Sequence, residues 1–97
     1  MTPEGKVKKK AKEVLDALGA WYFSPQSGIY GRSGIPDIVG CYKGKFFAIE
    51  CKAAGNTTTA LQERELCAIH AAGGLALVVD ETNVARLAGT IKLLGGN

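Results

Sequence analysis

The chain has 97 residues, of which 46% are hydrophobic and 22% are charged, and its formal net charge at pH 7 is +3. This composition is ordinary for a folded protein and argues against intrinsic disorder. The length suits one modest hydrophobic core, so we expect one domain spanning residues 1–97. A net charge of this size does not identify a partner, so the distribution of the charges has to be considered.

The sequence carries no recognisable signal for export or membrane insertion. No apolar run approaches the length needed to cross a bilayer, and lysines occupy the place where a secretory signal has its apolar segment. The three cysteines, Cys41, Cys51 and Cys67, are an odd number that cannot all pair with one another, and none has a zinc-site spacing. We therefore expect an intracellular, cytoplasmic protein with no membrane partner.

The first predicted element is an amphipathic helix over residues 3–18. Its apolar residues recur at the spacing of one helical face, and Gly19 ends it. The same segment holds lysines at positions 6, 8, 9, 10 and 12. The helix macrodipole disfavours cations in the early turns, so a bound polyanion would explain them. We name Lys6, Lys9 and Lys10 as candidate DNA-binding residues, with a solvated helix face as the open alternative.

The middle of the chain predicts three strands. A short aromatic run stops before Pro25, and two longer apolar runs are separated by Lys43 and Gly44, the kind of two-residue connection that hairpins use. A glycine-rich segment between the first strand and the hairpin predicts a mobile surface loop. The predicted strands cover residues 20–23, 35–42 and 45–53, and the loop covers residues 26–34.

The last part of the chain predicts a helix, a strand and a final helix. Residues 56–59 offer capping side chains before a helix that continues through Ala72. The almost fully apolar run at 75–80 predicts a buried strand, and Thr82 is placed to cap the last helix. The order α-β-β-β-α-β-α predicts an α/β fold with a mixed sheet flanked by helices.

Acidic and basic residues interrupt the apolar hairpin. With Lys43 and Gly44 as the turn, opposed residues have numbers that sum to 87, so Asp37 lies across from Glu50. Lys52 shares the face of Glu50 because side chains alternate along a strand. Like charges opposite one another destabilise a sheet, and a hard divalent cation held by both carboxylates would compensate. A Glu50–Lys52 salt bridge beside an unrelated Asp37 is the open alternative.

The same residues carry a family resemblance. Gly34-Ile35-Pro36-Asp37, then twelve residues, then Glu50-Cys51-Lys52 resembles the motif of the PD-(D/E)xK nuclease superfamily, and the run from Ser33 to Ile38 resembles its VRR-NUC branch. The resemblance implies a restriction-endonuclease-like fold. It also implies an enzyme that hydrolyses DNA phosphodiesters with Mg²⁺ or Mn²⁺. In this interpretation Asp37, Glu50 and Lys52 are catalytic, and both carboxylates bind the metal.

The resemblance implies further site residues. It assigns Glu13, an acid on the first helix, and the backbone carbonyl of Cys51 to the metal site. It assigns a catalytic role to Gln62 on the second helix, where a capping box with Thr59 is the structural alternative. Arg32 and Ser33 resemble the DNA-binding loop of archaeal Holliday-junction resolvases, which share the superfamily.

The resemblance also implies a substrate and a partner. Relatives that stand alone at this size often dimerise to place two active sites on branched DNA such as four-way junctions, so the resemblance implies a homodimer. A phage-encoded protein of replication or repair would fit this class. Two alternatives stay open. One is a non-catalytic DNA-binding module of the same fold, and the other is a subunit that needs a partner to complete its DNA surface.

Overall fold

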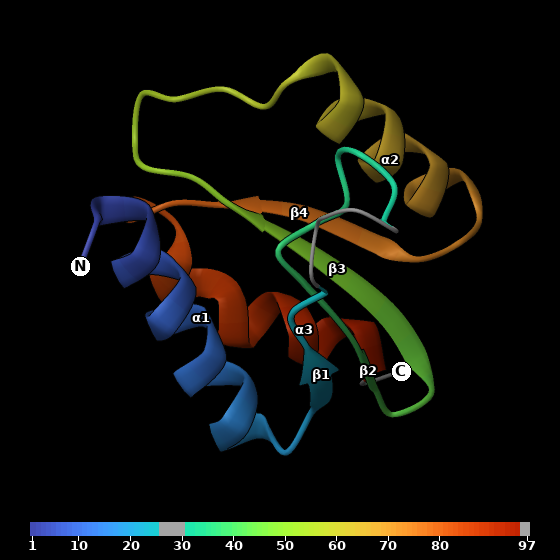
Figure 1. The fold of residues 1–97 in the computed structure, drawn as a ribbon. Coiled ribbons are helices and arrows are strands. Elements are labelled where there is room, and N and C mark those ends of the chain that lie inside the picture. Colours follow the sequence, from blue (N-terminus) through green and yellow to red (C-terminus); the bar gives the residue numbers. More distant parts are fainter. Residues whose placement is uncertain (26–30, 96–97) are drawn as a thin grey trace.

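The computed structural model describes residues 1–25 and 31–95, so residues 26–30 of the predicted loop lie outside the described residues. Within this part of the chain the elements follow the predicted order (Figure 1). They are α1 (Pro3–Leu18), β1 (Trp21–Phe23), β2 (Ile38–Tyr42), β3 (Lys45–Cys51), α2 (Ala60–Ala71), β4 (Leu75–Val79), a short 3₁₀ helix (Val84–Arg86) and α3 (Leu87–Gly95).

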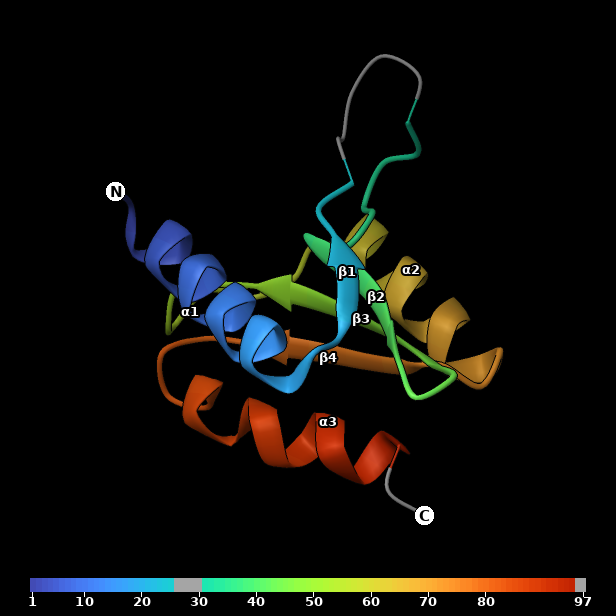
Figure 2. The ribbon, with the colours of Figure 1, turned by 90° about the horizontal axis from the view of Figure 1, so that it is seen from below.

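The four strands form one mixed sheet in the order β1-β2-β3-β4. The pairs β1–β2 and β2–β3 are antiparallel, and β3–β4 is parallel. Helices α1 and α3 contact each other and one face of the sheet, while α2 contacts β3 and β4 on the other face (Figure 2). The predicted α/β fold with a mixed sheet between helices is therefore confirmed.

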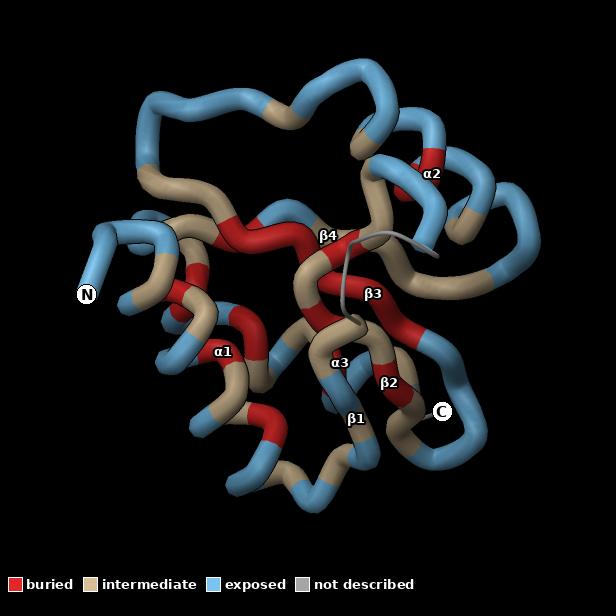
Figure 3. The backbone as a smooth tube through the Cα atoms, in the orientation of Figure 1, coloured by how far each residue is buried: buried red, intermediate tan, exposed pale blue. Residues whose placement is uncertain are grey.

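The main hydrophobic core lies between the sheet and the pair α1 and α3. Alternate residues of the central strand β3, Phe47, Ile49 and Cys51, are fully buried in it, and Leu15 of α1 packs against them. Figure 3 shows this buried stripe through the centre of the sheet. Because side chains alternate along a strand, Glu50 points to the opposite face, toward α2. The central position of β3 thus buries a carboxylate as well as the core residues.

Local signals in the sequence explain where α1 lies. Thr2 caps the helix because its hydroxyl oxygen accepts a hydrogen bond from the Gly5 N–H at 3.0 Å. Pro3 occupies the first turn, where its missing N–H costs nothing. Gly19 ends the helix in the left-handed conformation, with φ of 75°. These signals direct the chain from the end of α1 into β1.

Two predictions about the last part of the chain were wrong. Strand β4 is not buried throughout, because it pairs only with β3 among the described strands and forms an edge of the sheet, which leaves Val78 41% exposed. Thr82 does not cap the last helix. Its backbone N–H instead donates to Asp80 Oδ1 at 2.8 Å, and Asn83 precedes the 3₁₀ helix that leads into α3.

Among the described residues, no helix combines the length and apolar character needed to cross a membrane.

Candidate active site

The hairpin of β2 and β3 has the predicted register. Every pair from Ile38 with Ile49 to Tyr42 with Lys45 has numbers that sum to 87. The ladder stops one pair short of Asp37, because Pro36 precedes it and β2 begins only at Ile38. Asp37 is held instead through its side chain, since its Oδ2 accepts a hydrogen bond from the Cys51 N–H at 2.8 Å. The carboxylate of Asp37 therefore lies at the end of β3, beside Glu50.

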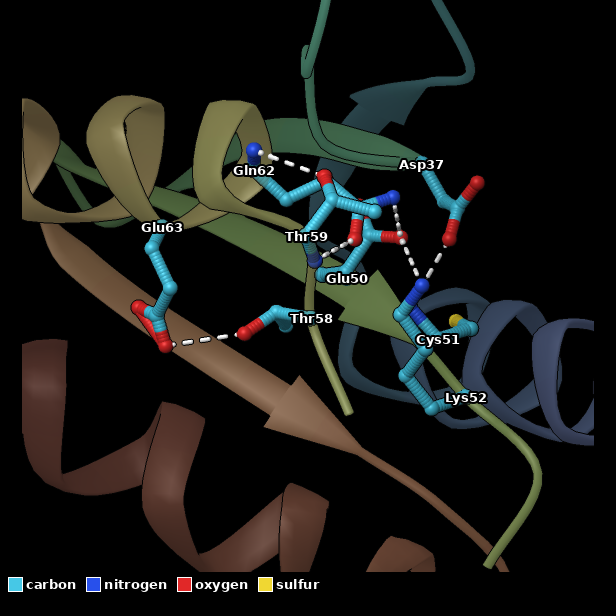
Figure 4. A network of polar contacts seen from close by, with 8 residues as sticks. All are labelled: Asp37, Glu50, Cys51, Lys52, Thr58, Thr59, Gln62 and Glu63. Carbon is cyan, nitrogen blue, oxygen red and sulfur yellow. Dashed lines mark hydrogen bonds and ion pairs between the residues drawn. The ribbon is translucent and has the colours of Figure 1, made fainter. Parts of the chain in front are cut away.

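Glu50 is the buried member of the site, with 3% of the residue exposed. Its Oε2 accepts a hydrogen bond from Gln62 Nε2 at 3.0 Å and lies 3.7 Å from Lys52 Nζ. The side chain of Lys52 is 12% exposed, so the ammonium is held close to the carboxylate with little solvent around it. Figure 4 shows Asp37, Glu50 and Gln62 converging at this point. The predicted convergence of two carboxylates and one ammonium is present in the structure.

The electrostatics of Glu50 reflect this crowding. Burial, and then the negative charge of Asp37, raise the pKa of Glu50 to about 7, while the Lys52 ammonium lowers it. A side-chain hydrogen bond with Asp37 and the charge of Glu4 add smaller rises to this pKa. One lysine thus fails to balance the two carboxylates and the burial. A second positive charge between Asp37 and Glu50 would be favourable, and their oxygens are the donors that Mg²⁺ or Mn²⁺ prefers.

Gln62 forms the capping box with Thr59 and also contacts Glu50, while its catalytic role stays a prediction. Its backbone N–H donates to Thr59 Oγ1 at 3.2 Å, and its Oε1 accepts from the Thr59 N–H at 2.9 Å, which completes the capping box. The remaining Nε2 is free to donate to Glu50. The cap fixes the amide so that a donor faces the buried carboxylate. The start of α2 thereby orients one of the two acidic residues.

The segment before Asp37 is docked on α2 at two points. Gly34 has φ of 83°, and a Cβ atom there would lie 2.4 Å from the backbone oxygen of Leu61, so only glycine fits. Arg32 donates from Nη2 to both carboxylate oxygens of Glu65 at 2.9 Å. These contacts, together with buried Pro36, hold Asp37 and the first turn of α2 in a fixed relation.

Glu65 was missed in the sequence analysis. It is 5% exposed, and its hydrogen bond from Arg32 lowers its pKa, with Arg64 acting in the same direction. Its position three residues after Gln62 places it on the same helix face, which was the available signal. Arg32, predicted to bind DNA, therefore already has an intramolecular partner, although its side chain is 72% exposed. Ser33 is exposed on the surface of the same segment.

The acidic residue of α1 that acts on the site is Glu4, which the sequence analysis did not name. Glu4 adds to the rise of the Glu50 pKa. Glu13 lies nine residues further along α1, which is two and a half turns and roughly 13 Å, on the opposite side of the helix. Glu13 is exposed and lines a surface hollow with Lys12 and Asp16. The structure does not bring it to the carboxylates, and its metal role stays a prediction.

Cys51 contributes its backbone to the site. Its side chain is fully buried in the core, and burial, followed by the charges of Asp37 and Glu50, raises the thiol pKa to about 12. The thiol is thus neutral, while the N–H binds Asp37. The predicted role of the Cys51 carbonyl as a metal ligand stays a prediction. Across residues 1–25 and 31–95, no group of three His, Cys, Asp or Glu side chains is placed to hold a metal ion. The carboxylates that the site offers to a metal are therefore the two of Asp37 and Glu50.

The lysines of α1 divide between two sides of the helix. Lys6 and Lys10 line a surface hollow together with Glu81, whereas Lys9 lines a second hollow with Lys8. Lys6, Lys9 and Lys10 are all exposed, as DNA-binding residues must be. Lys8 is half-buried, and its charge lowers the pKa of Cys51 against the larger effects of burial and the carboxylates.

Comparison with solved structures finds a protein described as "VRR_NUC domain" that is 29% identical to this chain, with a TM-score of 0.75. The match covers 92% of this chain and 97% of that one. This chain has the VRR_NUC fold. No model of a protein family matches it, and no curated protein does. The predicted resemblance of this chain to VRR-NUC proteins is therefore confirmed at the level of the fold, and the VRR_NUC fold supports a nuclease-type domain.

Proposed function

We propose that this chain is a Mg²⁺- or Mn²⁺-dependent DNA endonuclease that hydrolyses phosphodiester bonds. The observation that carries the proposal is the pairing of Asp37 with the buried Glu50, whose pKa is raised to about 7 by burial and by the Asp37 charge. Lys52 lies 3.7 Å from Glu50 and does not neutralise the pair. The VRR_NUC fold supports the same class of reaction.

The two carboxylates are the proposed metal ligands. Asp37 Oδ2 accepts a hydrogen bond from the Cys51 N–H, and Glu50 Oε2 accepts one from Gln62. The two carboxyl groups also lie within hydrogen-bonding reach of each other, so an ion bound between them would take the place of a shared proton. Glu4 is close enough to influence Glu50 and is the acid of α1 best placed to support the site. When bound, the ion supplies Lewis-acid stabilisation of the charge that develops on the phosphate.

Lys52 and Gln62 have separate proposed roles. The Lys52 ammonium, held next to Glu50 on the same face of β3, would bind a phosphate oxygen and stabilise the negative charge of the transition state. Gln62 acts through Glu50, because its amide is fixed by Thr59 and orients the carboxylate. Gln62 is thus a positioning residue in this mechanism. Preorganised groups of this kind need no rearrangement during the reaction.

We assign DNA binding to the exposed cations near the site. Lys6, Lys9 and Lys10 on α1 would contact phosphates, which makes binding sensitive to salt. Arg32 has most of its side chain exposed while it pairs with Glu65, so it can present a positive edge to DNA without leaving this partner. Ser33 beside it offers a hydroxyl. Substitution of any one lysine should weaken binding evenly across DNA sequences.

We further propose a homodimer that acts on branched DNA, in the cytoplasm of a host cell if the protein is phage-encoded. A domain of this size has a small footprint on DNA, and two copies would place two sites on one branched substrate. Light scattering at micromolar protein concentration tests the dimer directly. A monomeric mass would contradict it without affecting the chemistry.

The first experiment is cleavage of labelled linear, flap and four-way-junction DNA with Mg²⁺, Mn²⁺ or EDTA. We expect cutting in either metal and none in EDTA. Asp37→Asn and Lys52→Ala should each lose activity by roughly 100-fold or more. Lys45→Ala is the matched control, because Lys45 is an exposed lysine of the same strand at the end away from the site. Binding without cutting would favour the non-catalytic module, and full activity in Asp37→Asn would refute the site.

A further inference from the structure

Two neighbouring aromatic side chains on β1 are exposed. Trp21 is 65% exposed and Phe23 is 49% exposed, and their rings lie 5.6 Å apart in an edge-to-face arrangement. Between them Tyr22 points toward α1, since its hydroxyl donates to Asp16 Oδ1 at 2.7 Å. Because side chains alternate along a strand, Trp21 and Phe23 both point to the opposite face of the sheet. We call these two residues the aromatic pair.

This is the face of the sheet that carries the carboxylates. Helix α2 contacts β3 and β4 there, whereas β1 is an edge strand and the aromatic pair stays open. In the sheet register Phe23 is opposite Val39, which in turn is opposite Ala48. Asp37 lies two residues beyond Val39, and Glu50 lies two residues beyond Ala48, in the same direction along the sheet. With the spacing between strands included, Asp37 lies roughly 8 Å and Glu50 roughly 12 Å from Phe23. Phe23, and then Trp21, therefore lie next to the carboxylates on the same face of the sheet, at increasing distance from Asp37.

Resting on the proposed nuclease function, we propose that the aromatic pair is a stacking platform for unpaired DNA bases next to the scissile phosphate. A strand with one phosphate at Asp37 would carry its neighbouring nucleotides across β2 and β1. Exposed aromatic rings bind bases of any sequence by stacking. The bases of an intact duplex are already stacked on each other, so the platform selects DNA that has unpaired nucleotides beside the cut.

The position of the aromatic pair favours nucleotides over a second copy of the chain. An interface of standard size buries about 800 Å² on each partner, and one centred on Phe23 would extend over Asp37, roughly 8 Å away. Such a partner would block the approach of DNA to the carboxylates. Stacked bases use the same rings while the strand continues into the site. The proposed dimer must then use another surface.

Trp21 makes the proposal measurable, because it is the chain's one tryptophan. We would titrate the protein in EDTA with a short single-stranded oligonucleotide and with its duplex, and follow the fluorescence of Trp21. We expect saturable quenching by the single strand and little by the duplex. Phe23→Ala should weaken single-strand binding roughly tenfold, as expected for loss of one stacking ring. Val78→Ala is the control, since Val78 is also exposed but lies on β4 at the opposite edge of the sheet.

The outcomes separate this proposal from the proposed function. Equal quenching of Trp21 by the single strand and by the duplex would overturn the platform. A shift of Trp21 emission with protein concentration in the absence of DNA would also overturn it, because it would assign this face to a second copy of the chain. A nuclease whose Trp21→Ala and Phe23→Ala variants cut flaps and duplexes in the wild-type ratio would also overturn it. Single-strand quenching by a protein that cuts no DNA would support the platform and refute the nuclease.

Discussion

Replacing Glu50 with glutamine should make the metal-free protein more stable at alkaline pH. The pKa of Glu50 is raised from 4.5 to about 7, mainly by burial and by the charge of Asp37. A carboxyl whose pKa is raised on folding stabilises the fold below its unfolded pKa, and this contribution is lost as the pH rises through the folded pKa. Ionised Glu50 therefore opposes folding above about pH 7.

The magnitude follows from the size of the shift. Each pKa unit corresponds to about 1.4 kcal/mol. The difference between the folded and unfolded pKa values of Glu50 therefore lowers the free energy of unfolding by roughly 3 kcal/mol at pH 8.5 and by less than about 1 kcal/mol at pH 5. The side chain of Glu50 is only 4% exposed, so solvent screening reduces this little. Glutamine keeps the oxygen that accepts the hydrogen bond from Gln62 and removes the charge.

Urea denaturation followed by circular dichroism, in EDTA at pH 5 and pH 8.5, measures this difference. We expect Glu50→Gln to be more stable than the wild type by about 2 to 3 kcal/mol at pH 8.5, with a small difference at pH 5. Glu63→Gln, on the exposed side of α2, should have little effect at either pH. A Glu50→Gln variant that is less stable than the wild type at pH 8.5 would refute the electrostatic account of the site.

Three further predictions test the neighbouring residues. Gly34→Ala should lower the free energy of unfolding, measured by urea denaturation, by several kcal/mol, because its Cβ would enter the first turn of α2. Gly44→Ala, at the same φ of 83° but in open space, should lower it by about 1 to 2 kcal/mol. Equal losses would mean that the close contact at Gly34 is unimportant. Glu4→Gln should weaken Mg²⁺ binding in calorimetric titration and Glu13→Gln should not, and the reverse result would restore the assignment made from the sequence. Mg²⁺ affinity should rise between pH 6 and pH 8 because Glu50 must lose a proton before it binds a cation, and a flat profile would contradict the raised pKa.

The arrangement of Glu50 and Lys52 was predictable because both residues lie within one hairpin. A two-residue turn at Lys43 and Gly44 determines the register, and the alternation of side chains then places Glu50 and Lys52 on one face. The helices were predictable for a similar reason, since their apolar periodicities are local, although the cap predicted for the last helix, Thr82, was wrong. The capping box of Gln62 belongs to the same class of signal.

The sequence by itself therefore determined the order of the elements, the hairpin register and the placement of Asp37 beside Glu50, all of which depend on residues close in the chain. Only the tertiary structure decided that Glu4 and not Glu13 acts on Glu50, that Glu65 anchors Arg32, and that β4 forms an exposed edge. These features depend on how whole elements pack against one another. Periodicity identifies the buried face of a helix or strand, but it does not specify which distant segment covers that face or how far along the helix the contact falls.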